Sequence, residues 1–166
     1  MSEVHIDVSL AKQQLALYQA SDEGDIMLRR FPVSTARNGA GELEGSFCTP
    51  RGVHRIAQKI GADAPLFAVF KARVATGEIW TPQLDAEEPG RDWILSRILW
   101  LDGLEPGRNQ GGDVDSHARY IYIHGTNEED RIGSPVSHGC IRMRNADVVT
   151  LFDLVSVDTR VNIRED

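Results

Sequence analysis

Apolar and polar residues alternate along several short segments of the chain. Residues 6–10 carry an apolar side chain at every second position, and residues 15–17 repeat the pattern after a short connection. A period of two is typical of a half-buried strand, so these two segments predict a β-hairpin. Further strands are predicted over residues 26–33, 67–74 and 160–163.

The segment Arg119–Ile123 runs directly into a histidine, His124. Its isoleucine and tyrosine residues favour a strand that ends at His124. A histidine at the carboxyl end of a strand is held on a rigid element, which suits a catalytic base.

One segment has a helical period. Val148, Leu151, Phe152 and Val155 fall at positions i, i+3, i+4 and i+7. This spacing predicts a helix over about residues 146–155, with Asn145 as its N-cap. Many short strands with one helix predict a mainly β fold, a β-sandwich or open barrel decorated by that helix.

Two longer segments have no regular period. Residues 34–52 are rich in small and turn-forming residues and are predicted to be a loop. Residues 76–118 contain an apolar run, Asp92–Leu101, whose type the period does not settle, and a glycine-rich segment, Glu105–Asp115. Long loops in compact domains are often functional lids, so this region is expected to form a wall of a substrate cleft.

Length and charge narrow the class of protein. With 166 residues, 41% of them hydrophobic, the chain is expected to form one domain, residues 1–166. A formal net charge of −7 argues against nucleic acid or an anionic membrane surface as a partner. Residues 1–7 are acidic where a secretory signal is basic, and no apolar run of membrane-spanning length is present. A cytoplasmic protein with free thiols is therefore expected.

The segment Ser137–Asn145 reads Ser-His-Gly-Cys-Ile-Arg-Met-Arg-Asn. A thiol with a pKa of about 8.5 is only slightly ionised at neutral pH, so a nucleophilic Cys140 needs an imidazole within hydrogen-bond reach. His124 and His138 are the two candidates. Gly139 permits a strained turn and a close backbone approach, so N–H groups around Cys140 could stabilise an oxyanion.

Cys140 has two other interpretations. A lone cysteine is most often a small buried apolar residue, but a structural cysteine has no use for polar neighbours such as Ser137 and Arg142. The second interpretation is zinc, because His124, His138 and Cys140 would supply three ligands. No paired cysteines or second cluster at ligand-like spacing support a metal.

The two motifs together resemble the L,D-transpeptidase (YkuD-type) family. The family signature is a histidine, a gap of this length, then Ser/Thr-His-Gly-Cys, one residue and Arg or Asn, which here are His124 and Ser137–Arg142. Residues 33–35 and 49–52 also resemble blocks of the family, so the resemblance covers most of the chain. Asp158 stands where the family usually has a glycine before the last strand.

The resemblance implies a β-sandwich-like catalytic domain. It implies acyl transfer at peptidoglycan stem peptides, at the bond between meso-diaminopimelate and D-alanine. Cys140 would be the nucleophile and His124 the general base, with the backbone carbonyl of Gly125 orienting the imidazole. No metal and no cofactor are implied, and carbapenems are expected to acylate Cys140.

The same block supplies the expected substrate-binding residues. His138 resembles a structural or substrate-positioning partner, and Ser137 is grouped with it. Arg142 resembles a clamp for a carboxylate, because the planar guanidinium matches a carboxylate and a stem peptide carries several.

A thioester on Cys140 could be resolved by an amine or by water. Crosslinking acceptors lie outside the cytoplasmic membrane, whereas soluble murein tetrapeptides return to the cytosol during wall recycling. We therefore expect an L,D-carboxypeptidase that removes the terminal D-alanine of a murein tetrapeptide. The alternatives are an L,D-transpeptidase that forms crosslinks or exchanges D-amino acids, and a non-catalytic wall-fragment binding module that uses the Arg142 pocket.

Overall fold

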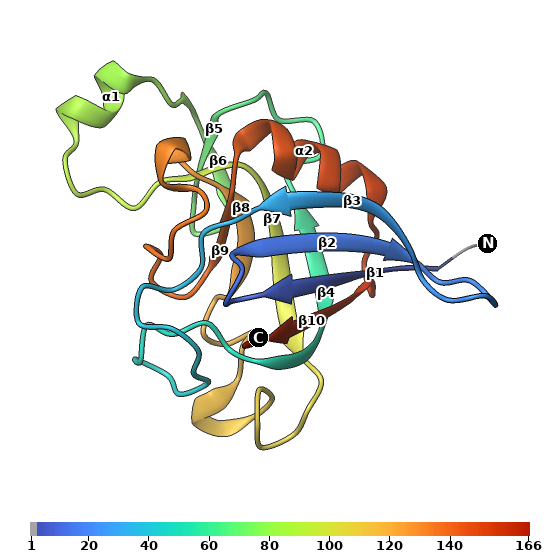
Figure 1. The fold of residues 1–166 in the computed structure, drawn as a ribbon. Helices are drawn as coiled ribbons and strands as arrows, with labels where there is room; N and C mark the ends of the chain where they lie inside the picture. Colours follow the sequence, from blue (N-terminus) through green and yellow to red (C-terminus); the bar gives the residue numbers. More distant parts are fainter. Residues whose placement is uncertain (1–2) are drawn as a thin grey trace.

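The computed structural model describes residues 3–166, and strands make up most of its regular structure (Figure 1). The strands are β1 (Val4–Ser9), β2 (Gln14–Gln19), β3 (Ile26–Pro32), β4 (Gly52–Ile60), β5 (Ala68–Lys71), β6 (Val74–Ile79), β7 (Ile94–Gly103), β8 (Tyr122–Gly125), β9 (Ile141–Met143) and β10 (Arg160–Arg164). The helices are α1 (Pro82–Glu87) and α2 (Asn145–Leu154), with short 3-10 turns η1 (Gly112–Val114) and η2 (Glu129–Arg131).

The strands of residues 3–166 belong to one sheet that is not closed into a barrel. Along its main path the order is β3-β2-β1-β10-β4-β7-β5-β6, and β8 pairs with both β7 and β9. The predicted first hairpin is present as β1 and β2, with Ile6 opposite Leu17. The prediction of a mainly β fold with one longer helix in the C-terminal half is confirmed.

Helix α2 packs its apolar side against β7 and β8. Val148, Leu151 and Phe152 are buried there in the largest core cluster. The predicted N-cap is wrong by one residue, because Arg144 occupies the cap and Asn145 is the first helical residue. The Asn145 side chain is fully buried. Its amide is satisfied there by hydrogen bonds inside the fold, one of them to the Thr126 carbonyl. Of the helices in residues 3–166, none combines the length and apolar character needed to cross a bilayer.

The apolar run over residues 92–101 forms most of β7, the strand that pairs with β4, β5 and β8. Most residues of β7 are buried, which explains why the run lacks the alternation of a half-buried strand. The glycine-rich segment Glu105–Asp115 closes against the start of β4, where Glu105 accepts a hydrogen bond from the Val53 amide at 2.7 Å. Of the region 76–118, for which a cleft wall is expected, Asp92 and Ile94 line the cleft described below, whereas no residue of Glu105–Asp115 does.

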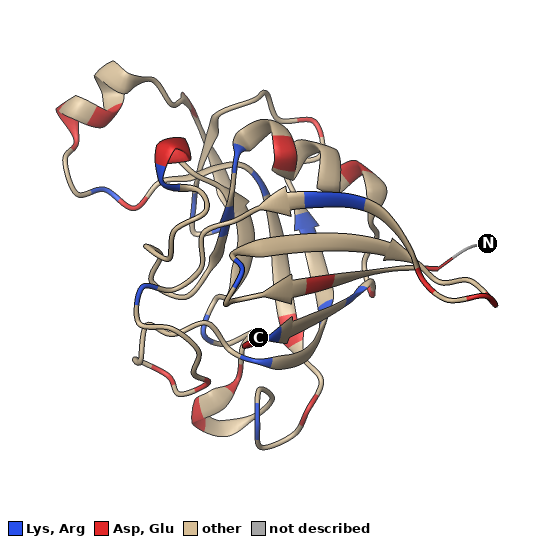
Figure 2. Ribbon diagram, in the orientation of Figure 1, with Lys and Arg blue, Asp and Glu red and all other residues tan. Residues whose placement is uncertain are grey.

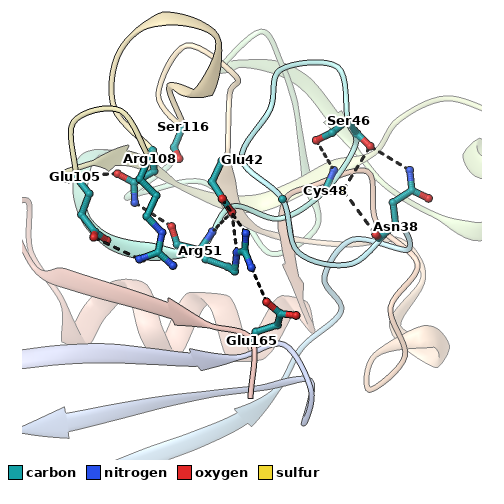
Figure 3. A network of polar contacts seen from close by, with 12 residues as sticks. Asn38, Glu42, Ser46, Cys48, Arg51, Glu105, Arg108, Ser116 and Glu165 are labelled. Atoms are coloured by element: carbon teal, nitrogen blue, oxygen red, sulfur yellow. Dashed lines mark hydrogen bonds and ion pairs between the residues drawn. The ribbon is translucent and has the colours of Figure 1, made fainter.

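Residues 34–52 form a loop, as predicted, and side chains fix it to the rest of the fold (Figure 3). Arg51 Nε lies 3.0 Å from Glu42 Oε2 and Arg51 Nη1 lies 2.6 Å from Glu165 Oε1, so the loop is tied to residues just beyond β10. Cys48 Sγ lies 3.6 Å from the carbonyl oxygens of Asn38 and Ser46. The contacts of the Cys48 thiol are therefore with backbone carbonyls of the same loop.

Candidate active site

A cleft of about 290 Å³ lies beside β7, β8 and β9. Five residues that the sequence singles out line it: His124, Ser137, His138, Cys140 and Arg142. The fold brings the two separated motifs together because β8, which ends with His124 and Gly125, runs parallel to β9, which follows Cys140 directly.

His124 lies in β8 opposite Ile98 of β7 and Arg142 of β9. Its Nδ1 lies 2.7 Å from the carbonyl oxygen of Gly125. Because a carbonyl oxygen only accepts hydrogen bonds, Nδ1 carries the proton and Nε2 keeps its lone pair. Burial lowers the pKa of His124 below its ordinary value of 6.5, so the imidazole is neutral at neutral pH.

A β-bulge in β7 fixes the surroundings of His124. The register between β7 and β8 shifts between Leu95 and Ile98, and Ser96 adopts a positive φ of 72° there. Ser96 Oγ donates to Asn145 Oδ1 at 2.7 Å, and Asn145 Nδ2 donates to the Thr126 carbonyl at 2.8 Å. A Cβ at Gly125 would lie 2.6 Å from the Leu95 carbonyl oxygen, so only glycine fits beside this network.

Cys140 stands in the turn just before β9. Its Sγ accepts a hydrogen bond from the Tyr122 amide at 3.3 Å, and its S–H is directed to the Tyr120 carbonyl oxygen at 3.4 Å. Burial raises the pKa of the Cys140 thiol to about 11. The resting side chain is therefore a thiol rather than a thiolate, so a nucleophilic role for Cys140 would require a base.

The resting thiol and imidazole share the cleft without a direct hydrogen bond between them in residues 3–166. Nε2 of His124 has no hydrogen-bond partner there and is not sealed in the interior. Proton transfer from Cys140 to His124 therefore requires the S–H to turn away from the Tyr120 carbonyl. Resting active-site hydrogen bonds are often loose and tighten only when substrate binds.

The turn that carries Cys140 is held by short polar contacts. Ser137 Oγ donates to the Cys140 carbonyl at 2.6 Å and accepts from the Gly139 amide at 3.2 Å. Thr49 Oγ1 donates to the Gly139 carbonyl at 2.9 Å. Gly139 adopts a φ of 131°, which a side chain at this position would strain. The Gly139 amide is thus already used within the turn, and Ser137 shapes the turn with its hydroxyl.

Arg142 lies in β9 and is 8% exposed. Its Nη1 lies 3.2 Å from Glu128 Oε1, so one side of the guanidinium already faces a carboxylate of the protein. A substrate carboxylate at Arg142 must use the remaining donors or displace Glu128. Sequence reasoning missed Glu128, which no local pattern connects to the cysteine motif.

His138 lies at the rim of the cleft and is exposed. Its ring meets the ring of Phe47 edge-on, with 5.8 Å between ring centroids. Phe47 belongs to the 34–52 loop, so His138 connects that loop to the cysteine turn. This position leaves His124 as the buried imidazole of the cleft.

The cleft is locally basic in an acidic protein. Figure 2 shows acidic residues on α1, on the turn between β2 and β3 and on the loop before β8. The cleft itself is lined by Arg73, Arg119 and Arg142, with Asp92 as its one acidic residue in the described chain. Sequence reasoning missed Arg73, in the turn between β5 and β6, and Asp92, in the segment before β7, because both lie far along the chain from the motifs. Within residues 3–166, no three or more His, Cys, Asp or Glu side chains cluster as a metal site would require.

A cysteine in the turn before β9 and a neutral histidine on the neighbouring strand β8, both lining one cleft, are features of a cysteine-dependent enzyme class. The family model described as "L,D-transpeptidase catalytic domain" (YkuD) matches residues 3–163, and the chain belongs to this family. The chain is 34% identical over 111 residues to "Probable L,D-transpeptidase YbiS" of Escherichia coli (strain K12), which covers 65% of this chain and 35% of YbiS. It is 33% identical over 116 residues to "Putative L,D-transpeptidase YkuD" of Bacillus subtilis (strain 168), covering 66% and 65% of the two chains. The chain thus spans about a third of YbiS and under two thirds of YkuD.

Solved structures share the fold. The "L,D-transpeptidase from Mycobacterium smegmatis" superimposes with a TM-score of 0.55 at 19% identity, over 98% of this chain and 59% of that chain. The "Structure of Bdellovibrio bacteriovorus Bd1075" gives a TM-score of 0.61 at 13% identity, over 99% and 48%. These likenesses, at low sequence identity, support the fold assignment.

Proposed function

We propose that this chain transfers acyl groups through a thioester on Cys140, acting on peptidoglycan stem peptides at the bond between the L centre of a diamino acid and D-alanine. One observation carries the proposal. Cys140 and a neutral His124 line the same cleft, and the Gly125 carbonyl holds Nδ1 of His124 so that Nε2 is the basic atom.

In the first half-reaction, Nε2 of His124 takes the proton of the Cys140 thiol while the sulfur attacks the carbonyl carbon of the scissile amide. The new C–S bond gives a tetrahedral oxyanion, for which the backbone amide of Cys140 is the proposed donor. The imidazolium then gives its proton to the leaving D-alanine nitrogen as the C–N bond breaks. Both groups start neutral, so the ion pair forms only during reaction, beside the positive charges of Arg119 and Arg142.

For the second half-reaction, we favour water as the acceptor, which makes the protein an L,D-carboxypeptidase of murein tetrapeptides. Nε2 of His124 would take a proton from water as its oxygen attacks the thioester, and the sulfur would leave with that proton. Asp92, Tyr120 and His138 are exposed on the lining of the cleft, so water has access to Cys140. The setting proposed with this substrate is the cytosol, which fractionation of cells with an antibody to the native protein tests.

Transfer to an amine is the second candidate. The relatives named above as probable or putative L,D-transpeptidases favour it. In this reaction an amine replaces water in the second half-reaction, and the product is a crosslink or an exchanged D-amino acid.

Incubation of the pure protein with free and disaccharide-linked tetrapeptides, followed by mass spectrometry, tests the proposal. We expect loss of one alanine, and no product from Cys140→Ala protein of unchanged thermal stability. Dimers or D-amino-acid-exchanged products without the shortened peptide would reverse the ranking in favour of transfer. Reversible binding without turnover, unaffected by Cys140→Ala, would indicate a binding module.

Carbapenem acylation gives a second readout of Cys140. One structural neighbour is described as "Structure of LD transpeptidase LdtMt1 in complex with imipenem". We expect intact-mass measurement to show one imipenem adduct on the wild-type protein and none on Cys140→Ala. An adduct on both proteins would contradict the assignment of Cys140.

A further inference from the structure

The charged side chains that line the cleft differ in how many hydrogen bonds and ion pairs they form with the rest of the protein. Arg142 faces Glu128 at 3.2 Å. Arg119 donates to the carbonyl oxygens of Cys48 at 2.8 Å and Glu42 at 3.0 Å. Arg73 donates to the Tyr122 hydroxyl at 2.9 Å. Asp92 has neither a hydrogen bond nor an ion pair from its carboxylate to any residue in the described range 3–166.

The chain on both sides of Asp92 is firmly held. Arg91 forms ion pairs with Glu78 at 2.8 Å and with Glu88 at 2.6 Å, and its guanidinium lies 4.3 Å from the Trp93 ring centroid. Trp93 is 3% exposed and packs in a core cluster with Leu95. The Asp92 carboxylate is therefore presented to the cleft from a fixed backbone, which lowers the entropic cost of binding a ligand.

Asp92 also lies within electrostatic reach of the reacting pair. Burial is the main influence on the pKa of both His124 and Cys140, and the negative charge of Asp92 acts on both as well. A cation held by Asp92 would thus lie near the scissile bond rather than at a remote surface.

We propose that Asp92 is the binding site for a primary ammonium group of a stem peptide held in the cleft. The inference rests on the proposed function, because it assigns part of the substrate to a residue that neither motif contains. A stem peptide with a diamino acid carries carboxylates, which suit the three arginines, and an ammonium group, which suits a lone carboxylate. The ammonium comes either from the diamino acid of the donor peptide or from the amine of an acceptor.

A double cycle, which combines the substitution Asp92→Asn with a change in the substrate, tests whether the ammonium belongs to the donor peptide. Two tetrapeptides with a blocked N-terminus are compared as substrates for hydrolysis. One has a free side-chain amine on its diamino acid, and the other is acetylated at that side-chain amine. We expect Asp92→Asn to lower kcat/KM for the free amine by about 5- to 10-fold, mainly through KM, since the pair is partly solvated. The acetylated peptide should show no further loss in Asp92→Asn. Asp63→Asn, which changes an exposed carboxylate outside the cleft lining, should match wild type with both peptides.

A second arm tests the acceptor source. The rate of product formation is followed against the concentration of an amine acceptor, with the donor saturating. A change in acceptor KM in Asp92→Asn, without a change in donor KM, would assign the site to the acceptor. Equal effects of Asp92→Asn on free and acetylated donors, together with an unchanged acceptor KM, would overturn the proposal.

Two controls separate this inference from the proposed function. Alkylation of Cys140 by neutral iodoacetamide should not slow in Asp92→Asn, because the reagent carries no ammonium; a slower reaction would show damage to the thiol instead. If wild-type protein turns over no stem peptide, the proposed function fails. Calorimetric binding of the free and acetylated tetrapeptides to Cys140→Ala protein, with and without Asp92→Asn, then still decides whether Asp92 prefers the ammonium form.

Discussion

His54 and His124 are two buried strand histidines that the fold treats differently. His54 is 0% exposed and His124 is 2% exposed, and burial lowers the pKa of both below 6.5. Both ring nitrogens of His54 have protein partners, the Gly52 carbonyl at 3.0 Å and the Ser116 hydroxyl at 2.8 Å. His124 has a partner only at Nδ1 within residues 3–166.

The comparison shows what burial does and does not determine. Burial makes an imidazole neutral, which holds for both residues. A base also needs a ring nitrogen that the protein leaves free, and only His124 of this pair has one. A lowered histidine pKa therefore identifies a neutral imidazole, and the unsatisfied nitrogen identifies the candidate base.

The largest effect is expected at His124. His124→Ala should lower kcat/KM by about 10²- to 10⁴-fold, because the neutral Cys140 thiol loses the base that would take its proton. Steady-state kinetics on the tetrapeptide, with circular dichroism as a check on folding, measures this. A well-folded His124→Ala variant with near-normal activity would contradict the role of His124 as the base and its distinction from His54.

The same change at His54 should act on stability instead. His54→Ala removes a buried ring and leaves the Ser116 hydroxyl without its partner, so we expect a loss of about 2–4 kcal/mol in the free energy of unfolding. Urea denaturation measures the loss, and kcat/KM at 25 °C should stay near that of wild type. A loss of activity as large as in His124→Ala would contradict the distinction.

Acid should destabilise the fold through both histidines. Because the folded pKa of His54 is about 4, below the 6.5 of an ordinary histidine, the unfolded chain binds protons that the folded chain does not. Stability is thus full above pH 6.5 and falls toward pH 4, by about 3 kcal/mol for His54 alone. The loss between pH 6.5 and 4 should be smaller in His54→Gln than in wild type, as measured by urea denaturation at each pH; identical pH profiles would contradict the assignment.

Substitution of Asn145 tests whether the hydrogen bonds beside Gly125 position His124 for catalysis. Asn145→Ala removes the bridge between Ser96 and the Thr126 carbonyl, beside Gly125. We expect a loss of about 2 kcal/mol in stability and about a 10-fold fall in kcat. Thr150→Ala, on the exposed side of α2, should change neither. A stability loss without any change in kcat would limit Asn145 to a structural role.

The smallest effect is expected at Arg142. Arg142→Lys keeps the charge but loses the planar fork that faces Glu128 and could hold a carboxylate, so kcat/KM should fall by about 5- to 10-fold with an intact fold. Arg144→Lys, at an exposed position, is the matched control. Unchanged kinetics in Arg142→Lys would contradict the role of Arg142 in binding a substrate carboxylate.

The sequence predicts those parts of the molecule that depend on local periods. Alternation predicts the β1–β2 hairpin, and a period of 3.6 predicts α2. The run that became β7 is ambiguous, because a strand buried on both faces has no polar positions to reveal its period. The glycines of Glu105–Asp115 predict a loop but carry no information about where it packs.

The candidate site likewise contains residues that local motifs predict and residues that only the folded chain brings together. Cys140, His124 and Arg142 belong to two short motifs, and the expected Gly125 carbonyl does face Nδ1. Asp92 lines the cleft, Glu128 pairs with Arg142, and Ser96 in the β7 bulge bonds to Asn145, but these contacts join distant parts of the chain, so no local pattern indicates them. The sequence predicts Asn145 as the N-cap of α2, whereas Asn145 is the first helical residue and its side chain donates to the buried Thr126 carbonyl, a partner that no local pattern reveals.

The parallel pair β1 and β10 has a consequence for how a nascent chain reaches this fold. In the strand order, the β3-β2-β1 meander joins β4 and the remaining strands through β10, with His5 opposite Arg160. Contacts between such distant residues form slowly, because a long loop must close before they stabilise anything. While the ribosome is still making β10, the edge of β1 stays unpaired and open to strand addition by other chains. We therefore expect slow, late folding that benefits from chaperones at high expression levels.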